Sequence, residues 1–212
     1  MKGDMPSTRN EEPAVEFHPV TPDRWPNLVR FFERHGNPNY CWCMRWRLSS
    51  SEFRRLKSAD RKRALEGRVR AGMPIGILGY LGEEPVGWCS IAPRETYALL
   101  ERSKTIKRVD NKTTWAVVCF FVAPKMRGQH FTVELLRAAV EYARSHGAQV
   151  IEGFPVEPRV GADGNLQPAT YRHMGYVSTF RKAGFREVAS PDKGRRIMRY
   201  IVSPGEERKH KA

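Results

Sequence analysis

The chain has 212 residues, with 37 Lys and Arg against 23 Asp and Glu, so its formal net charge is +14. This length fits one domain with a sizeable core, which we place at residues 14–203 between a polar tail (1–13) and a basic tail (204–212). The positive surplus favours anionic ligands. No apolar run has membrane length and residues 1–13 hold no apolar signal segment, so we expect a cytoplasmic protein without a membrane partner.

The first part of the chain predicts a strand, two helices and a hairpin. Residues 15–19 read as a strand, and Thr21-Pro22-Asp23 predicts a helix start, with the helix ending near His35 and a loop at 37–40. Ser58 can cap a second helix through about Ala71. Two apolar stretches, 75–81 and 86–92, flank a turn and predict a β-hairpin.

The second part begins with a basic stretch, 94–112, in which a short helix is expected near 97–102. The apolar run 115–122 is too short for a membrane span and predicts a strand buried on both faces. Apolar residues then recur every three or four positions up to His146, which predicts an amphipathic helix packed on a sheet. Further strands are expected at 149–156, 187–189 and 195–202, and a helix within 169–183.

The turn between the buried strand and the long helix is a candidate anion site. The first N–H groups of a helix have no intrahelical partner and carry partial positive charge, so a diphosphate would be stabilised there. The segment Arg127-Gly128-Gln129-His130-Phe131-Thr132 resembles the acetyl-CoA-binding signature of the GNAT-type N-acetyltransferase superfamily, Arg/Gln-x-x-Gly-x-Gly/Ala. His130 stands where that family usually has Gly, and Thr132 where it has Gly or Ala; either side chain could point away or donate to phosphate.

Other segments extend the resemblance over roughly residues 15–202. The stretch from Ser178 to Phe185 resembles the family's second element, in which an aromatic-x-Lys-x-Gly-Phe helix end precedes a short strand. The predicted hairpin stands where the family has its second and third strands. The run Tyr40-Cys41-Trp42-Cys43-Met44-Arg45-Trp46-Arg47 is similar to the opening of an uncharacterised bacterial subgroup.

The resemblance implies a fold and a cosubstrate. The fold would be α+β, a single-domain acyl-CoA N-acyltransferase (GNAT-like) fold with a mixed, splayed sheet of six or seven strands flanked by helices. The cosubstrate would be acetyl-CoA, with no metal. The residues implied to contact the coenzyme are Phe121, Val122, Ala123, Arg127, Gly128, Gln129, His130, Phe131, Thr132 and Phe180.

Acetyl transfer to an amine needs a proton acceptor and a donor for the developing oxyanion. Glu152 is the candidate base, because Ile151 and Phe154 would partly desolvate its carboxylate. An exposed carboxylate or an ion pair with arginine is the more frequent arrangement for such a residue. Many family members have a Tyr general acid where this chain has Phe180, so Tyr176, Tyr171 or water would donate the proton, if the role is needed.

The aromatic cluster of Tyr40, Trp42, Trp46 and Trp88 is the candidate wall of the acceptor pocket, where ring faces could receive a cation or a flat ring. Burial in the core is the more common fate of such residues. The one-residue spacing of Cys41 and Cys43 is not that of a zinc site, so we predict no metal.

These features predict an acetyl-CoA-dependent N-acetyltransferase that acts on a primary amine of a small molecule or peptide, as a monomer or homodimer. The alternative is a catalytically silent coenzyme A-binding or basic nucleic-acid-binding module. Nucleic acid is not the partner we expect, because the sequence shows no helix-turn-helix, zinc-finger or RNA-recognition signature.

Overall fold

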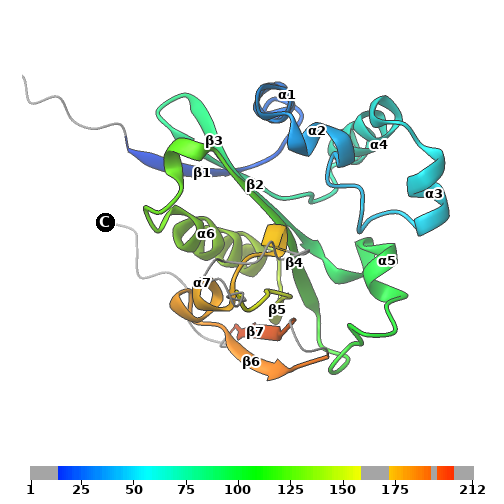
Figure 1. The fold of residues 1–212 in the computed structure, drawn as a ribbon, viewed down its shortest axis with the longest axis vertical. Helices are drawn as coiled ribbons and strands as arrows, with labels where there is room; N and C mark the ends of the chain where they lie inside the picture. The colour runs from blue at the N-terminus through cyan, green and yellow to red at the C-terminus, as the bar shows by residue number, and fades with distance from the viewer. Residues whose placement is uncertain (1–13, 159–171, 192–194, 203–212) are drawn as a thin grey trace, which may run out of the picture.

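A computed structural model describes residues 14–158, 172–191 and 195–202 (Figure 1). The helices are α1 (Trp25–His35), α2 (Asn37–Cys41), α3 (Ser50–Arg55), α4 (Ser58–Arg70), α5 (Ala98–Glu101), α6 (Phe131–Ser145) and α7 (Val177–Lys182). The 3-10 turns are η1 (Arg94–Thr96), η2 (Pro124–Met126) and η3 (Arg172–Met174). The strands are β1 (Val15–Pro19), β2 (Ile77–Leu81), β3 (Glu84–Pro93), β4 (Thr114–Val122), β5 (Val150–Gly153), β6 (Arg186–Ala189) and β7 (Ile197–Ile201). Both predicted tails lie outside the described residues.

The strands form one mixed sheet in the order β1-β2-β3-β4-β5-β7-β6. Only the central pair β4 and β5 is parallel, and α6 makes the crossover between them. The other neighbours are antiparallel. The predicted α+β fold with a mixed sheet of six or seven strands is confirmed. Within the described residues, no helix is long and apolar enough to cross a membrane.

Helices cover both faces of the sheet (Figure 1). On β3, the ring of Trp88 packs against Phe32 of α1 with a centroid distance of 5.8 Å. The adjacent Gly87 leaves room for Phe131 of α6, whose ring would lie 2.3 Å from a Cβ added there. Since successive strand residues face opposite sides of a sheet, α1 and α6 cover opposite faces of β3.

Two short helices between α1 and α4 were not predicted. The expected loop at 37–40 is wrong, because α2 begins directly after Gly36 with a proline in its first turn. Helix α3 begins at a capping box in which the Ser49 hydroxyl accepts from Glu52 N–H and the Glu52 carboxylate accepts from Ser49 N–H. Together these helices bring the segment 37–55 to the central strand.

The central strands part where the sheet splays. The pairing of β4 with β5 ends at Val117 and Gly153, although β4 continues to Val122. Beyond Gly153, Phe180 of α7 fills the space, and its ring would lie 2.0 Å from a Cβ added at Gly153. Phe180 also packs edge-on against Phe120 of β4, at 6.0 Å between centroids. This packing fixes the width of the gap between β4 and the segment 172–179.

Candidate active site

A cavity of about 760 Å³ lies at this splay, between the second half of β4 and the segment 172–179. Its third wall comes from the N-terminal segment around α2 and α3. The lining residues are Pro38, Tyr40, Cys41, Cys43, Arg45, Trp46, Phe53, Val118, Cys119, Phe120, Phe121, Val122, Arg127, Thr132, Arg172, His173, Gly175, Tyr176 and Thr179. The predicted residues Phe121, Val122, Arg127, Thr132, Tyr176 and Tyr40 therefore meet around one space.

The end of β4 offers backbone groups to this cavity. Ala123 N–H donates to Val86 O of the neighbouring strand at 2.9 Å, so the next residue pair, Val122 with Gly87, is a non-hydrogen-bonded pair. The N–H and C=O of Val122 therefore face away from β3, toward the side where β5 has already ended. The C=O of Val122 accepts from Arg127 Nε at 3.3 Å, which holds Arg127 beside the strand end.

The turn before α6 contains two left-handed residues. Gly128 has a φ of 79° and His130 a φ of 59°. All residues from Arg127 to His130 are exposed. His130 stands where the resembling family has Gly, and its backbone adopts a conformation that Gly takes without steric cost. The substitution therefore leaves the shape of the turn unchanged and adds backbone strain of about 1–2 kcal/mol.

The variant His130→Gly should bind acetyl-CoA at least as tightly as the native protein. Glycine adopts the same left-handed backbone, and among the described residues the imidazole has no hydrogen bond or ion pair to lose. The matched variant Gly128→Ala introduces a Cβ at a positive φ, with no atom within 4 Å of it, so it should lose about 1–2 kcal/mol of stability through backbone strain alone. Calorimetric titration and denaturant unfolding measure the two effects. A large loss of coenzyme affinity in His130→Gly would instead make the imidazole a ligand contact.

The segment 172–179 contributes two titratable side chains to the cavity. Tyr176 is half-buried directly before α7, and its backbone pairs with Val156. His173 lies in η3 at the cavity rim. Partial desolvation, and then repulsion from Arg195, lower the pKa of His173 below the ordinary value of 6.5. The imidazole is therefore neutral at pH 7 and able to accept a proton. Tyr171, the other predicted donor, lies outside the described residues.

The aromatic wall differs from the prediction. Tyr40 lines the cavity and is 64% exposed. Trp42 and Trp88 are buried in the core, where the indole N–H of Trp42 donates to Ser58 Oγ at 3.1 Å and that of Trp88 to Cys43 Sγ at 3.0 Å. The proposal that both form pocket walls is wrong, since neither reaches the cavity. Trp46, also a member of the predicted cluster, does line the cavity, together with Phe53.

Residues 42–47 form a strained, firmly anchored turn. Trp42 and Cys43 both have positive φ, 46° and 48°, which bulky residues rarely adopt. The buried Arg47 holds the turn: its guanidinium donates to Cys43 O at 3.2 Å, to Ile75 O at 2.7 Å and to Ser90 Oγ at 3.0 Å. Such strain persists only where the surroundings over-determine the backbone, and it is concentrated at functional sites. Arg45 and Trp46, which lie within this turn, line the cavity.

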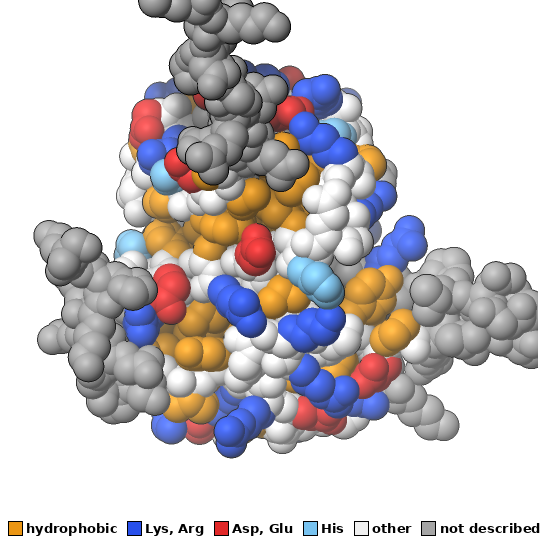
Figure 2. Space-filling model, turned by 90° about the vertical axis from the view of Figure 1, so that its left-hand side faces the viewer, with side chains coloured by type: hydrophobic (Ala, Val, Ile, Leu, Met, Phe, Trp, Pro, Cys, Tyr) orange, Lys and Arg blue, Asp and Glu red, His pale blue; other side chains and the backbone are white. Residues whose placement is uncertain are grey.

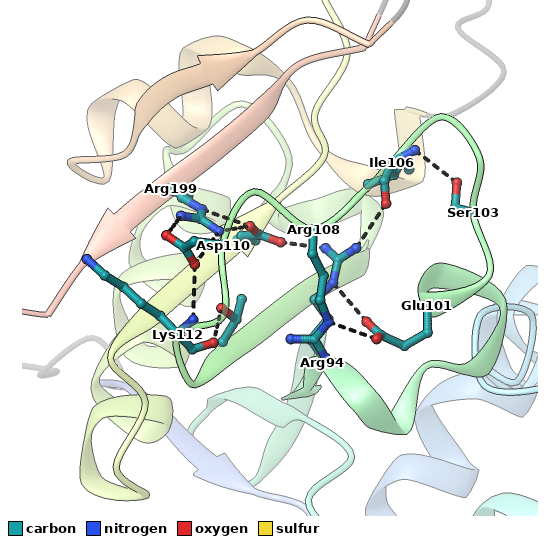
Figure 3. A network of polar contacts seen from close by, with 10 residues as sticks. Arg94, Glu101, Ser103, Ile106, Arg108, Asp110, Lys112 and Arg199 are labelled. Carbon is teal, nitrogen blue, oxygen red and sulfur yellow. Dashed lines mark hydrogen bonds and ion pairs between the residues drawn. The ribbon is translucent and has the colours of Figure 1, made fainter.

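Glu152 does not line the cavity. Its side chain is 1% exposed, and its carboxylate accepts from Arg94 Nη1 at 2.5 Å and from Arg199 Nε at 2.7 Å. Arg199 also donates to Asp110 at 2.6 Å, and Arg94 to Glu101 at 2.9 Å, as Figure 3 shows. A carboxylate that is enclosed by two guanidinium groups and lies away from the cavity cannot reach an acceptor amine. The structure corresponds to the ion-pair alternative, so we no longer propose Glu152 as the base.

The remaining coenzyme residues fall into two groups. Gly128, Gln129 and His130 are exposed in the turn and do not line the cavity. Ala123, Phe131 and Phe180 are buried, so the side chains of Phe131 and Phe180 serve packing. For Phe180 this placement does not support a coenzyme contact.

Three thiols reach the cavity wall. The contact with Cys43, followed by burial, raises the pKa of Cys41, and the contact with Cys119 raises that of Cys43. The two thiols therefore stay protonated and apolar in character at neutral pH. Among the described residues, no group of three His, Cys, Asp or Glu side chains could hold a metal ion. The absence of a bound metal stays a prediction.

The sequence profile of the Acetyltransferase (GNAT) family matches residues 41–164, more than half of the chain. The protein belongs to the GNAT acetyltransferase family. The match spans the N-terminal wall, β4 and the start of α6, which are the elements that build most of the cavity. No match was found among curated protein sequences.

Solved structures share the fold at low identity. The aminoglycoside acetyltransferase AAC(6')-Ib, solved with coenzyme A and kanamycin, is 17% identical, with 89% of this chain and 95% of that chain covered and a TM-score of 0.53. The yncA protein of Salmonella typhimurium, solved with acetyl-CoA, is 15% identical, with coverage of 92% and 97% and a TM-score of 0.51. A GNAT acetyltransferase of Streptococcus pneumoniae is 15% identical, with coverage of 90% and 100% and a TM-score of 0.50.

Proposed function

We propose that the protein is an acetyl-CoA-dependent N-acetyltransferase that acetylates a primary amine of a small molecule or peptide. The observation that carries this proposal is the cavity at the splay, where the free edge of β4 and the start of α6 border one space. Family membership supports acyl transfer, and the neighbours solved with acetyl-CoA or with coenzyme A and kanamycin support the cosubstrate and an amine acceptor.

The residues around the cavity fit acetyl-CoA. Arg127 and the first N–H groups of α6, next to Thr132, would hold the diphosphate, since a helix start stabilises phosphate oxygens. The N–H and C=O of Val122 would pair with the pantetheine arm. When bound, the coenzyme supplies a thioester whose carbonyl carbon is open to attack by an amine.

The acceptor amine must be neutral to attack, because an alkylammonium has a pKa near 10.4 and no lone pair. We assign the proton acceptor to His173, the neutral imidazole at the cavity rim. As the amine nitrogen bonds to the thioester carbon, its proton passes to His173, directly or through water. The C–S bond then breaks, and the sulfur leaves as a thiolate.

Tyr176 is the candidate donor to that thiolate, because its side chain lines the cavity beside His173. In this chain Phe180 occupies the position at which the resembling family carries its acid, and Phe180 is buried against Phe120. Tyr176, directly before α7, would protonate the thiolate in place of a residue within α7, and the packing of Phe180 against Phe120 would stay unchanged.

The base assignment predicts a pH dependence. Because the pKa of His173 is lowered from 6.5, kcat should fall as the pH drops through that lowered pKa and the imidazole becomes charged. His173→Gln should reduce kcat by about 10²- to 10⁴-fold, remove this acidic limb and leave acetyl-CoA binding intact. Steady-state kinetics from pH 5 to 9 measure this. Near-normal turnover in His173→Gln would mean that His173 is not the base and that water accepts the proton.

Product analysis tests the activity itself. The purified protein, acetyl-CoA and a mixture of primary amines should yield free thiol together with products 42 Da heavier, as expected for replacement of one hydrogen by an acetyl group. Acetyl-CoA should also raise the melting temperature, since a native-state ligand at a hundred times its Kd adds about 2.7 kcal/mol. Stabilisation without any acetylated product would favour the silent coenzyme A-binding alternative.

The nucleic-acid alternative has little support from the surface. In the described part of the face in Figure 2, Lys and Arg side chains are interspersed with acidic and hydrophobic ones and do not form one continuous basic surface. Stabilisation by a DNA or RNA oligonucleotide, but not by acetyl-CoA, would favour this alternative. The cytoplasmic location and a monomeric or homodimeric state stay predictions.

A further inference from the structure

We infer that the acceptor is an amine that also carries an anionic group, a carboxylate or a phosphate, and that Arg45 and Trp46 bind this group. The inference rests on the proposed N-acetyltransferase function and names its substrate class. It depends on the charge of the cavity wall, on one unpartnered donor, and on the anchoring of the segment that bears both residues.

The described part of the cavity wall is positively charged. Three arginines line it, Arg45, Arg127 and Arg172, and none of the described lining residues is Asp or Glu. Arg127 is held beside the end of β4, where we place the coenzyme diphosphate, so its charge is matched when the coenzyme is bound. Arg45 and Arg172 form no hydrogen bond or ion pair with a described residue. Their charges are therefore available to an acceptor.

Trp46 adds an unused donor next to Arg45. Its indole N–H is buried and has no hydrogen-bond partner in the described part of the chain. A buried donor without a partner costs about 1–3 kcal/mol, which a ligand oxygen at this position would recover. Other atoms of the side chain line the cavity, so a rotation of the indole ring would bring this N–H to a carboxylate or phosphate oxygen held by Arg45.

The turn before Arg45 and Trp46 is firmly anchored. Trp42 and Cys43 keep left-handed backbones and are buried in the core, and the buried Arg47 fixes the turn through Cys43 O and Ile75 O. The cost of the strained residues, about 1–3 kcal/mol each, is offset by these contacts. Arg45 and Trp46 therefore extend to the cavity wall from a fixed segment.

A positive wall also serves the chemistry of the amine. Nearby positive charge lowers the pKa of a bound ammonium group and so increases the neutral fraction that can attack the thioester. The same field disfavours a polycation such as kanamycin, which AAC(6')-Ib binds in its solved complex. An amine with an anionic group satisfies both demands, because the anion binds the arginines while the amine loses its proton.

Matched acceptor pairs test this inference. The native protein with saturating acetyl-CoA is assayed on the common α-amino acids against their decarboxylated amines, on O-phosphoethanolamine against ethanolamine, and on kanamycin. Members that carry an anion should have kcat/KM values about tenfold to a hundredfold above those of their partners without an anion, the range expected for a charge-assisted hydrogen bond. The amino-acid and phosphate pairs show which anion is preferred.

The variant Arg45→Gln should abolish most of that preference by raising KM for the anionic members, while the KM for acetyl-CoA stays within about twofold. Arg54→Gln, an exposed arginine of α3 that does not line the cavity, is the matched control and should keep the preference. An equal loss of kcat/KM in Arg45→Gln for acceptors with and without an anion would make Arg45 a structural residue and overturn the assignment.

Two further outcomes would overturn the inference. One is a higher kcat/KM for kanamycin or for the amines without an anion than for every acceptor that carries one. The other is acetylation of none of the anionic amines by a protein that acetyl-CoA stabilises, with no binding of them detected by calorimetry in the presence of coenzyme A. Failure of the proposed function would look different, because acetyl-CoA would then be consumed with no amine of any kind, whether or not it stabilised the protein.

Discussion

Replacing Glu152 by alanine should destabilise the fold by about 3–5 kcal/mol, the cost of leaving buried charge without its partner. Its carboxylate lies between Arg94 and Arg199, whose side chains are 1% and 5% exposed. Removing it leaves two guanidinium groups with less compensation where η1 lies against β5 and β7. Denaturant unfolding of native protein and variant measures the difference.

The control for this experiment is Glu141→Ala, which breaks an exposed ion pair with Arg144 on α6 and should cost no more than about 1 kcal/mol. A Glu152→Ala variant as stable as the native protein would contradict the buried network. Glu152→Gln separates structure from chemistry: the folded variant should retain turnover on a true acceptor, because Glu152 does not reach the cavity.

Reversing the charge of Arg127 should weaken acetyl-CoA binding about a hundredfold or more. The guanidinium is held beside Val122 and lines the cavity next to the start of α6, where we place the diphosphate. Arg127→Glu removes a charge-assisted hydrogen bond worth about 1.5–3 kcal/mol and adds repulsion between carboxylate and phosphate. Since Arg127 is exposed, its unfolding free energy should change little.

Calorimetric titration of acetyl-CoA into Arg127→Glu and into Arg54→Glu separates the local effect from the change in net charge. Arg54→Glu changes the net charge equally but lies on α3, away from the cavity wall, and should keep most of the affinity. Equal losses in both variants would mean that only the long-range positive field attracts the coenzyme. An unchanged affinity of Arg127→Glu for acetyl-CoA would mean that the diphosphate does not bind at this turn.

Local signals predicted most of the fold. The apolar run of β4 and the helical period of α6 are long and regular. Strand β4 begins one residue before the predicted strand, and α6 ends one residue before the predicted end at His146. Helices α2 and α3 were missed because they are short and bury little, although Ser49 and Glu52 form a capping box that is visible in the sequence.

The site was predictable only where a backbone pattern defines it. The strand end and the turn at Arg127 follow from a local strand-turn-helix motif, and Val122 and Arg127 both reach the cavity. The place of Glu152 outside the cavity was not predictable, because its partners Arg94 and Arg199 come from parts of the chain that are distant in sequence. His173 had no sequence signal of its own: its place beside β4 depends on the sheet splay.

The central claim is that acetyl-CoA binds at the splay between β4 and the segment 172–179. A crystal structure of the protein with acetyl-CoA tests it most directly. We predict that the pantetheine arm pairs with the backbone of Val122, that the diphosphate lies against Arg127 and the first turn of α6, and that the acetyl group points into the cavity lined by His173 and Tyr176. Coenzyme bound at another surface, with this cavity left to solvent, would contradict the account.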